Sequence, residues 1–126
     1  MSARRSLWLL IAALALAAGC VTPSVPIPPP SPENMAFEVD ADNGFAQFEF
    51  EPDPSYSQAI VYVFNRDVGA GIITTADEDG AVPLTDPFAA TVGDEIIVTF
   101  EVDTQLASTC VRLEPGQSSQ GLRCEL

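Results

Sequence analysis

The chain has 126 residues with 18 Asp or Glu, five Arg, no Lys and no His, and its formal net charge is −13. A surface this acidic repels nucleic acid and anionic headgroups, so nucleic-acid binding is excluded as its function. Without His or Lys the chain cannot form a Ser-His or Cys-His nucleophile, an amine base or a Schiff base, so we expect no enzyme. A carboxylate-pair hydrolase remains as an alternative, but a β-domain of about 90 residues leaves little room for the cleft it needs.

The N-terminus has the order typical of an export signal, which is positive, then apolar, then small. Arg4 and Arg5 come first, an apolar run extends from Leu7 to Ala18, and Gly19 and Cys20 follow. The run is shorter than the ~20 residues that span a bilayer, which argues against a transmembrane anchor. A plain secretory signal, cleaved after the small residues, is the other alternative.

The segment Ala17-Ala18-Gly19-Cys20 resembles the lipobox of bacterial lipoproteins, with Leu16 one place earlier than usual. The resemblance implies that Cys20 is acylated and becomes the mature N-terminus. Acyl chains that each bury ~0.8 kcal/mol per methylene would then hold the protein on a membrane of the cell envelope. By the sorting rule of Gram-negative lipoproteins, Val21 rather than Asp after the cysteine favours the outer membrane.

A proline-rich segment follows the lipobox. Six prolines within residues 21–35 exclude a helix or a central strand and favour polyproline II, a semi-rigid spacer with a rise of ~3.1 Å per residue. We therefore expect a signal peptide over residues 1–19, a lipidated tether over residues 20–35 and one domain over residues 36–126. A ligand for a proline-recognition module is the alternative interpretation of the tether.

From residue 36 onward apolar and polar residues alternate with a period of two, which predicts strands. Asn43-Gly44 lies between two such runs and predicts a hairpin with a two-residue turn. On the core face this turn pairs Ala41 with Ala46, Val39 with Phe48, and Phe37 with Phe50. On the other face it sets Glu38 opposite Glu49, which indicates an exposed face with a loosely held counterion.

Later strands are expected between turn signals. Residues 59–64 are apolar on both faces, which predicts a central strand. In chain order the expected strands after the hairpin are Ala59–Phe64, Ile72–Thr75, Ala81–Leu84, Phe88–Val92, Glu95–Asp103 and Thr109–Leu113. With the hairpin this gives seven or eight short strands with turns every ~8–12 residues, which predicts an all-β fold, a small antiparallel β-sandwich.

Residues 59–103 carry a second likeness. A strand leads to Thr74-Thr75 and an Asp79-Gly80 turn, and another strand leads to Gly93-Asp94 and a further strand. This order resembles bacterial Ig-like and carboxypeptidase-regulatory-like sandwich domains. The resemblance implies an Ig-like fold and a non-catalytic adhesion, spacer or assembly module.

Once Cys20 is assigned to lipid, Cys110 and Cys124 remain. An even pair of cysteines in an exported protein predicts a disulfide, which here closes a loop of about 15 residues and contributes ~3 kcal/mol in the chain-entropy model. A redox or metal role would need more ligands than two cysteines and no histidine supply.

The best metal candidate lies in the loop from Thr75 to Asp86. Asp77, Asp79 and Gly80 could stand at the third, fifth and sixth positions of an EF-hand loop. Thr75 and Asp86 are then the wrong residues at the first and twelfth positions, so the loop is no EF-hand. A looser Ca²⁺ site that uses Asp77 and Asp79 stays open beside the simpler interpretation as a tight turn, and we expect no other cofactor.

Together these features predict a lipid-anchored cell-envelope protein whose sandwich is a structural or interaction domain. Its expected partners are a membrane, through the N-terminal lipid, and another envelope protein. The alternative function is a Ca²⁺-binding acidic surface module.

Overall fold

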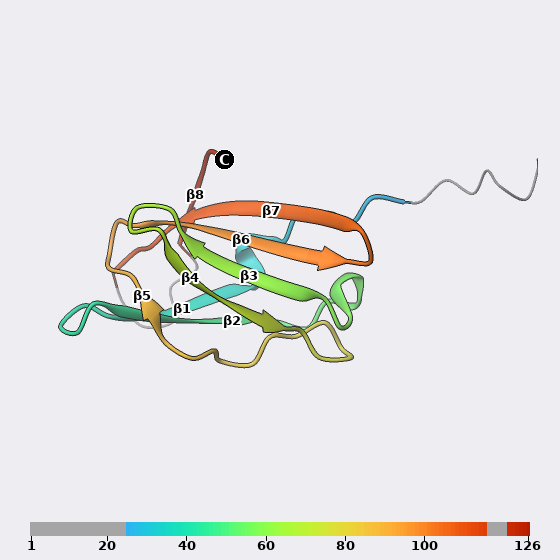
Figure 1. Ribbon diagram of the computed structural model, residues 1–126, viewed down its shortest axis with the longest axis horizontal. Coiled ribbons are helices and arrows are strands. Elements are labelled where there is room, and N and C mark those ends of the chain that lie inside the picture. The colour runs from blue at the N-terminus through green and yellow to red at the C-terminus, as the bar shows by residue number, and fades with distance from the viewer. Residues whose placement is uncertain (1–24, 116–120) are drawn as a thin grey trace, which may run out of the picture.

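The period-two alternation produces strands throughout the computed structural model, which describes residues 25–115 and 121–126 (Figure 1). The eight strands are β1 (Met35–Asp40), β2 (Phe45–Phe50), β3 (Ile60–Asn65), β4 (Ala70–Thr75), β5 (Phe88–Ala89), β6 (Glu95–Val102), β7 (Gln105–Arg112) and β8 (Leu122–Cys124). Two 3₁₀ turns, η1 (Pro32–Asn34) and η2 (Pro54–Tyr56), are the only helical elements in the described residues. The signal helix expected over residues 1–19 lies outside them.

The strands form two antiparallel sheets. One sheet has the order β1-β2-β5 and the other has the order β4-β3-β6-β7-β8. All neighbouring strands pair antiparallel, so the prediction of a small antiparallel sandwich with about eight strands is confirmed.

Inward-facing residues of both sheets form one core. Its largest members come from both layers and include five aromatic rings: Phe37, Phe48, Phe50, Tyr56 and Phe100. The alternation in β6 predicts Ile96, Val98, Phe100 and Val102 as inward residues; the first three are each 0% exposed, and Val102 is partly buried against the core. Fully burying a side chain of this size stabilises the fold by roughly 1.5–3 kcal/mol, so alternating strands of this length have enough apolar surface to hold two sheets together.

The β1–β2 hairpin forms, but its expected register is wrong by two residues. The core-face pairs are Val39 with Ala46, Phe37 with Phe48, and Met35 with Phe50. Because the shift is even, Phe37, Val39, Ala46, Phe48 and Phe50 still face the core, but Ala41, also expected there, is exposed in the loop. Glu38 now lies opposite Gln47, so the predicted pairing of Glu38 with Glu49 does not occur.

The turn itself explains the shift. The Asp40 carboxylate accepts hydrogen bonds from the backbone N–H of Asn43 at 3.2 Å and from its side-chain amide at 2.7 Å. The N–H of Gly44 donates to the Asp40 carbonyl at 2.9 Å, which closes a loop of residues 41–44. A two-residue type I′ turn needs positive φ at both central residues, and only Gly44 has it, at +73°.

The bounds of β3, β4 and β6 agree with prediction to within two residues, and the other three later strands differ by more. Residues 81–84 make only an isolated bridge, Phe50 with Val82, and the strand expected from Phe88 to Val92 is reduced to Phe88–Ala89. The strand expected from Thr109 begins at Gln105, because a tight turn with Asp103 at a φ of 55° folds β7 directly back on β6. β8 was not predicted from the sequence.

Part of the proline-rich segment lies against the sandwich, which differs from the free tether expected up to residue 35. Ile27 donates its N–H to the Gln105 side chain at 2.7 Å. Further along, Tyr56 donates its hydroxyl to the Pro28 carbonyl at 2.6 Å, and Thr109 donates its hydroxyl to the Pro30 carbonyl at 2.5 Å. The segment is therefore docked from Ile27 onward.

Burial reinforces this docking. Pro30 and Pro32 are buried, and Ile27 packs against the core. Tyr56 is 1% exposed, and this burial, together with the charge of Asp53, raises the pKa of its hydroxyl to about 12. The phenol therefore stays protonated and keeps its hydrogen bond to the segment well above neutral pH.

Candidate functional site

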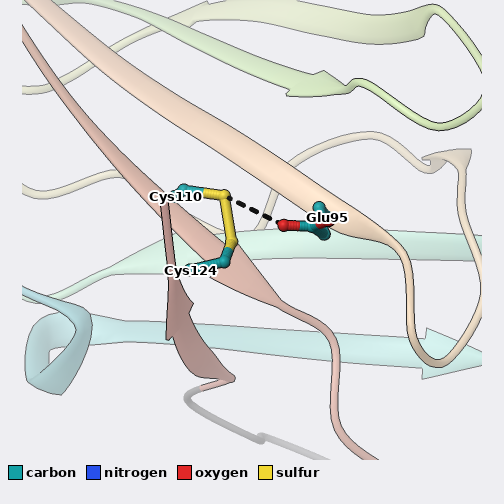
Figure 2. A group of neighbouring side chains, drawn as sticks. All are labelled: Glu95, Cys110 and Cys124. Carbon is teal, nitrogen blue, oxygen red and sulfur yellow. Dashed lines mark hydrogen bonds between the residues drawn. A yellow bond between two sulfur atoms is a disulfide. The ribbon is translucent and has the colours of Figure 1, made fainter. Parts of the chain in front are cut away.

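Cys110 and Cys124 form a disulfide, as predicted, and Glu95 lies beside it (Figure 2). The two sulfur atoms are 2.03 Å apart. β7 carries Cys110 and β8 carries Cys124 directly opposite it in the ladder, whereas Glu95 is the first residue of β6. The bond therefore fastens the short outer strand β8 to the long strand β7.

Glu95 is held in place by its neighbours. Its carboxylate accepts from the Arg66 guanidinium at 2.6 Å and lies 3.7 Å from that of Arg112. Its backbone N–H donates to the Asp67 carboxylate at 2.7 Å. These ion pairs are partly exposed to water, and such pairs contribute at most about 1 kcal/mol each, so Glu95 orders this end of the sheet without dominating its stability.

The chemistry of this cluster depends on the oxidation state of its sulfurs. The Cys110 sulfur lies 3.8 Å from a Glu95 carboxylate oxygen, and Figure 2 marks this contact. A disulfide sulfur carries no hydrogen to donate, so the contact is a close approach of the two atoms. Glu95, Cys110 and Cys124 are the only metal-ligand trio found among the described residues, but metal binding by cysteine requires thiolates. In the disulfide form the cluster therefore has a structural role, which is to link β8 covalently to β7.

Asp77 and Asp79 lie together in the exposed turn after β4. One carboxylate oxygen of Asp77 accepts from the backbone N–H of Asp79 at 2.9 Å and from that of Ala81 at 3.0 Å. Gly80 has a φ of +77°, and a Cβ at this position would meet the Asp53 carbonyl oxygen at 1.7 Å. The Asp-Gly pair thus forms a tight turn that requires glycine, and the Asp77 carboxylate serves the turn backbone.

The structure does not bring a third carboxylate to Asp77 and Asp79 within the ranges it describes. Ca²⁺ takes six to eight oxygen ligands, commonly from several carboxylates and carbonyls. The sequence indicated both acidic residues and their turn. In the structure the Asp77 carboxylate accepts hydrogen bonds from the backbone of that turn.

Replacing Asp77 by alanine (Asp77→Ala) should lower the free energy of unfolding by about 1 kcal/mol, because two turn hydrogen bonds are lost. The melting temperature should show the same decrease in millimolar Ca²⁺ and in chelator. Asp42→Ala, at an exposed acidic residue in the β1–β2 loop, is the matched control and should change the melting temperature little. Stabilisation of the native protein by Ca²⁺, lost in Asp77→Ala, would instead establish a cation site.

The predicted lipidation residue Cys20 lies outside the described residues, which begin at residue 25. Figure 1 shows the N-terminal segment leaving the sandwich at the end where β6 turns into β7. The hydrogen bond from Ile27 to Gln105, the first residue of β7, fixes this exit. The β1–β2 hairpin projects at the opposite end of the molecule (Figure 1).

Sequence reasoning missed an apolar surface on the outer face of the five-stranded sheet. Residues of β3 that alternate with the core residues point away from it, and Ile60 and Phe64 are 40% and 42% exposed. Ile73 on β4 is 71% exposed beside them. The available signal was the double apolar character of residues 59–64, which predicted the central position of β3 in its sheet but not a face left uncovered.

No helix in residues 25–115 or 121–126 is long and apolar enough to cross a bilayer. Comparison of the chain with protein-family models, with curated proteins and with solved structures finds no match.

Proposed function

We propose that this chain is a lipid-anchored cell-envelope protein and that its sandwich, of the Ig-like type, is a non-catalytic interaction domain. The observation that carries the proposal is the N-terminal order of positive, apolar and small residues that ends at Cys20. The Cys110–Cys124 disulfide supports export, because such bonds persist in oxidising compartments. The absence of His and Lys from the sequence supports a role without nucleophilic or amine catalysis.

The docked proline segment supports a specific placement of the domain. If lipid is attached at Cys20 and the chain is held to the sandwich from Ile27 on, the free tether spans at most about 25 Å. The domain then lies close to the membrane, with the β6–β7 hairpin nearest to it and the β1–β2 hairpin turned away. An acidic surface repels anionic headgroups, which keeps the domain off the bilayer itself. Val21 favours the outer membrane as the site of attachment.

The anchor is tested with Cys20→Ala, which removes the thiol that carries the lipid. We expect the native protein to sediment with membranes after a high-salt wash, and the variant to remain in the soluble fraction, because the acyl chains supply the binding energy. Thr22→Ala is the matched control and should leave the protein in the membrane fraction. Mass spectrometry of the native N-terminus should show Cys20 as the first residue, with acyl groups attached.

Sedimentation of Cys20→Ala with membranes, or an unmodified residue 20 in protein released into the medium, would refute the anchor. Ca²⁺ binding by the acidic loops is the alternative function, and the comparison of Asp77→Ala with the native protein decides it.

A further inference from the structure

One edge of the five-stranded sheet is open. β4 is its outer strand and pairs with β3 alone, and residues 70–75 make no other backbone hydrogen bond among the described residues. β5 packs close to the start of β4, where the Ala89 carbonyl accepts from the side chain of Asn65, the ladder partner of Ala70, so the open part of the edge is the end toward Thr75. Ala76 donates its N–H to the Ala59 carbonyl at 2.8 Å, which sets the phase of the ladder. Because the bonding direction alternates along an antiparallel strand, the backbone groups of Ile73 and Thr75 point away from β3.

This edge lacks the protection that the other sheet edges have. β1 carries Glu38 and Asp40, β8 carries Arg123, and β5 has only two residues. β4 has six residues, Ala-Gly-Ile-Ile-Thr-Thr, without a charge or a proline. Charges, proline and shortness are the usual devices that keep edge strands from pairing with other chains. Their absence from β4 leaves this edge able to accept another strand.

An apolar surface lies next to the open edge. A shallow hollow lies over residues 62–64 and 71–73, and the exposed side chains of Phe64 and Ile73 border it. Gly71 lies opposite Phe64 in the β3–β4 ladder and leaves the ring of Phe64 uncovered on that side. An added strand would therefore find both backbone partners and a place for its own apolar side chains.

Carboxylates stand at one end of β4. Asp77, Glu78 and Asp79 follow the strand, whereas Asp67, which precedes it, is turned toward β6 and accepts the Glu95 N–H at 2.7 Å. The nearby cation Arg66 is paired with Glu95 at 2.6 Å. A segment that lies along β4 thus meets an acidic turn at the end of the strand, on a chain whose formal net charge is −13, and this favours an apolar segment flanked by Lys or Arg.

We propose that the β4 edge binds an extended, positively charged segment of a partner protein, which pairs with Ile73 and Thr75 as a sixth strand of the sheet. This proposal rests on the interaction function and names its surface and its partner chemistry. A second copy of this chain does not fit. Each copy has a formal net charge of −13 and an acidic turn directly after β4, and like charges disfavour the pairing of two such edges.

The test uses the full-length protein in intact cells, with a photo-crosslinking amino acid at position 73. A second probe at position 106 is the matched control, because Leu106 is also highly exposed, at 65%, and lies on β7 of the same sheet. We expect an adduct at position 73 whose partner peptide carries net positive charge, and no such adduct at position 106. Membrane fractionation of the same cells reports separately on the lipid anchor.

Two substitutions sharpen the test. Thr75→Pro removes an outward N–H without breaking the ladder with β3, and Thr75→Lys adds a charge that repels a basic segment. Each should lower the yield of the adduct at position 73 by about tenfold, which corresponds to ~1.4 kcal/mol. Leu106→Lys adds the same charge away from the edge and should leave the yield unchanged.

Four results would overturn the edge proposal: no adduct at position 73, the same adduct at both positions, a crosslinked pair of copies, or a neutral or acidic partner peptide. An adduct at position 106 alone would refute the edge proposal but would still support the proposed interaction function. Release of the native protein from membranes would refute the anchor proposal. The peptide crosslinked at position 73 would still test the edge proposal.

Discussion

Phe100→Ala is expected to lower the free energy of unfolding by about 3–5 kcal/mol, because it leaves a cavity where the two sheets meet. Phe100 is 0% exposed. Its ring centroid lies 4.5 Å from that of Tyr56 and 4.9 Å from that of Phe50, so one side chain of β6 contacts both η2 and β2. Domains of this size are stable by only about 5–15 kcal/mol, so the variant should unfold at a far lower urea concentration.

Phe45→Ala is the matched control for this measurement. Phe45 is also an aromatic residue in a strand, but it is 46% exposed at the start of β2. Its removal should change the unfolding free energy by less than about 1 kcal/mol. If both variants unfold at the same urea concentration, Phe100 is not the central residue of the core.

The core could be predicted because it depends on local pattern. In β6 each inward residue is apolar and each neighbour is directed to the other face, so Ile96 and Phe100 follow from spacing alone. The β1–β2 register could not be predicted in the same way. The Asn43-Gly44 pair favours a two-residue turn, but the Asp40 side chain stabilises a longer loop, and the core pattern accepts either register because they differ by an even number.

The candidate sites show the same difference between features that the local sequence sets and features that depend on residues distant in sequence. Cys110 and Cys124 were paired correctly because only one pairing remains after Cys20 is assigned to lipid. The docking of the proline segment was missed because its partners are distant in sequence: Pro30 and Thr109 are separated by 79 residues. A run of prolines favours the same extended backbone whether it is free or docked, so its composition carries no signal for the difference.

The open β4 edge was missed for a related reason. The short run Ile72–Thr75 predicted a strand, and a strand was found, but its place at the edge of the sheet depends on which strands pair. Pairing is a property of the whole sandwich. Once the strand order is known, the uncharged sequence of β4 becomes informative, because the same residues in a central strand would need no explanation.

Reducing the Cys110–Cys124 disulfide is expected to lower the free energy of unfolding by about 3 kcal/mol. The bond joins residues 14 apart, and the same model assigns roughly this value to a closed loop of that length. β8 pairs only with β7 and has three residues, so it should separate first. Amide exchange should therefore accelerate at Leu122 and Cys124 of β8, whose backbone groups point toward β7, while the central strands β3 and β6 remain protected.

The double variant Cys110→Ser/Cys124→Ser is the control, because reductant should no longer change its melting temperature. Equal stability of the native protein with and without reductant would show that the bond is incidental to the fold. A loss of about 3 kcal/mol from a small domain would make the folded state marginal in a reducing compartment. The disulfide would then couple stability to export, because the domain would reach its full stability only in an oxidising compartment outside the cytoplasm. The proposed anchor at Cys20 places the domain in such a compartment.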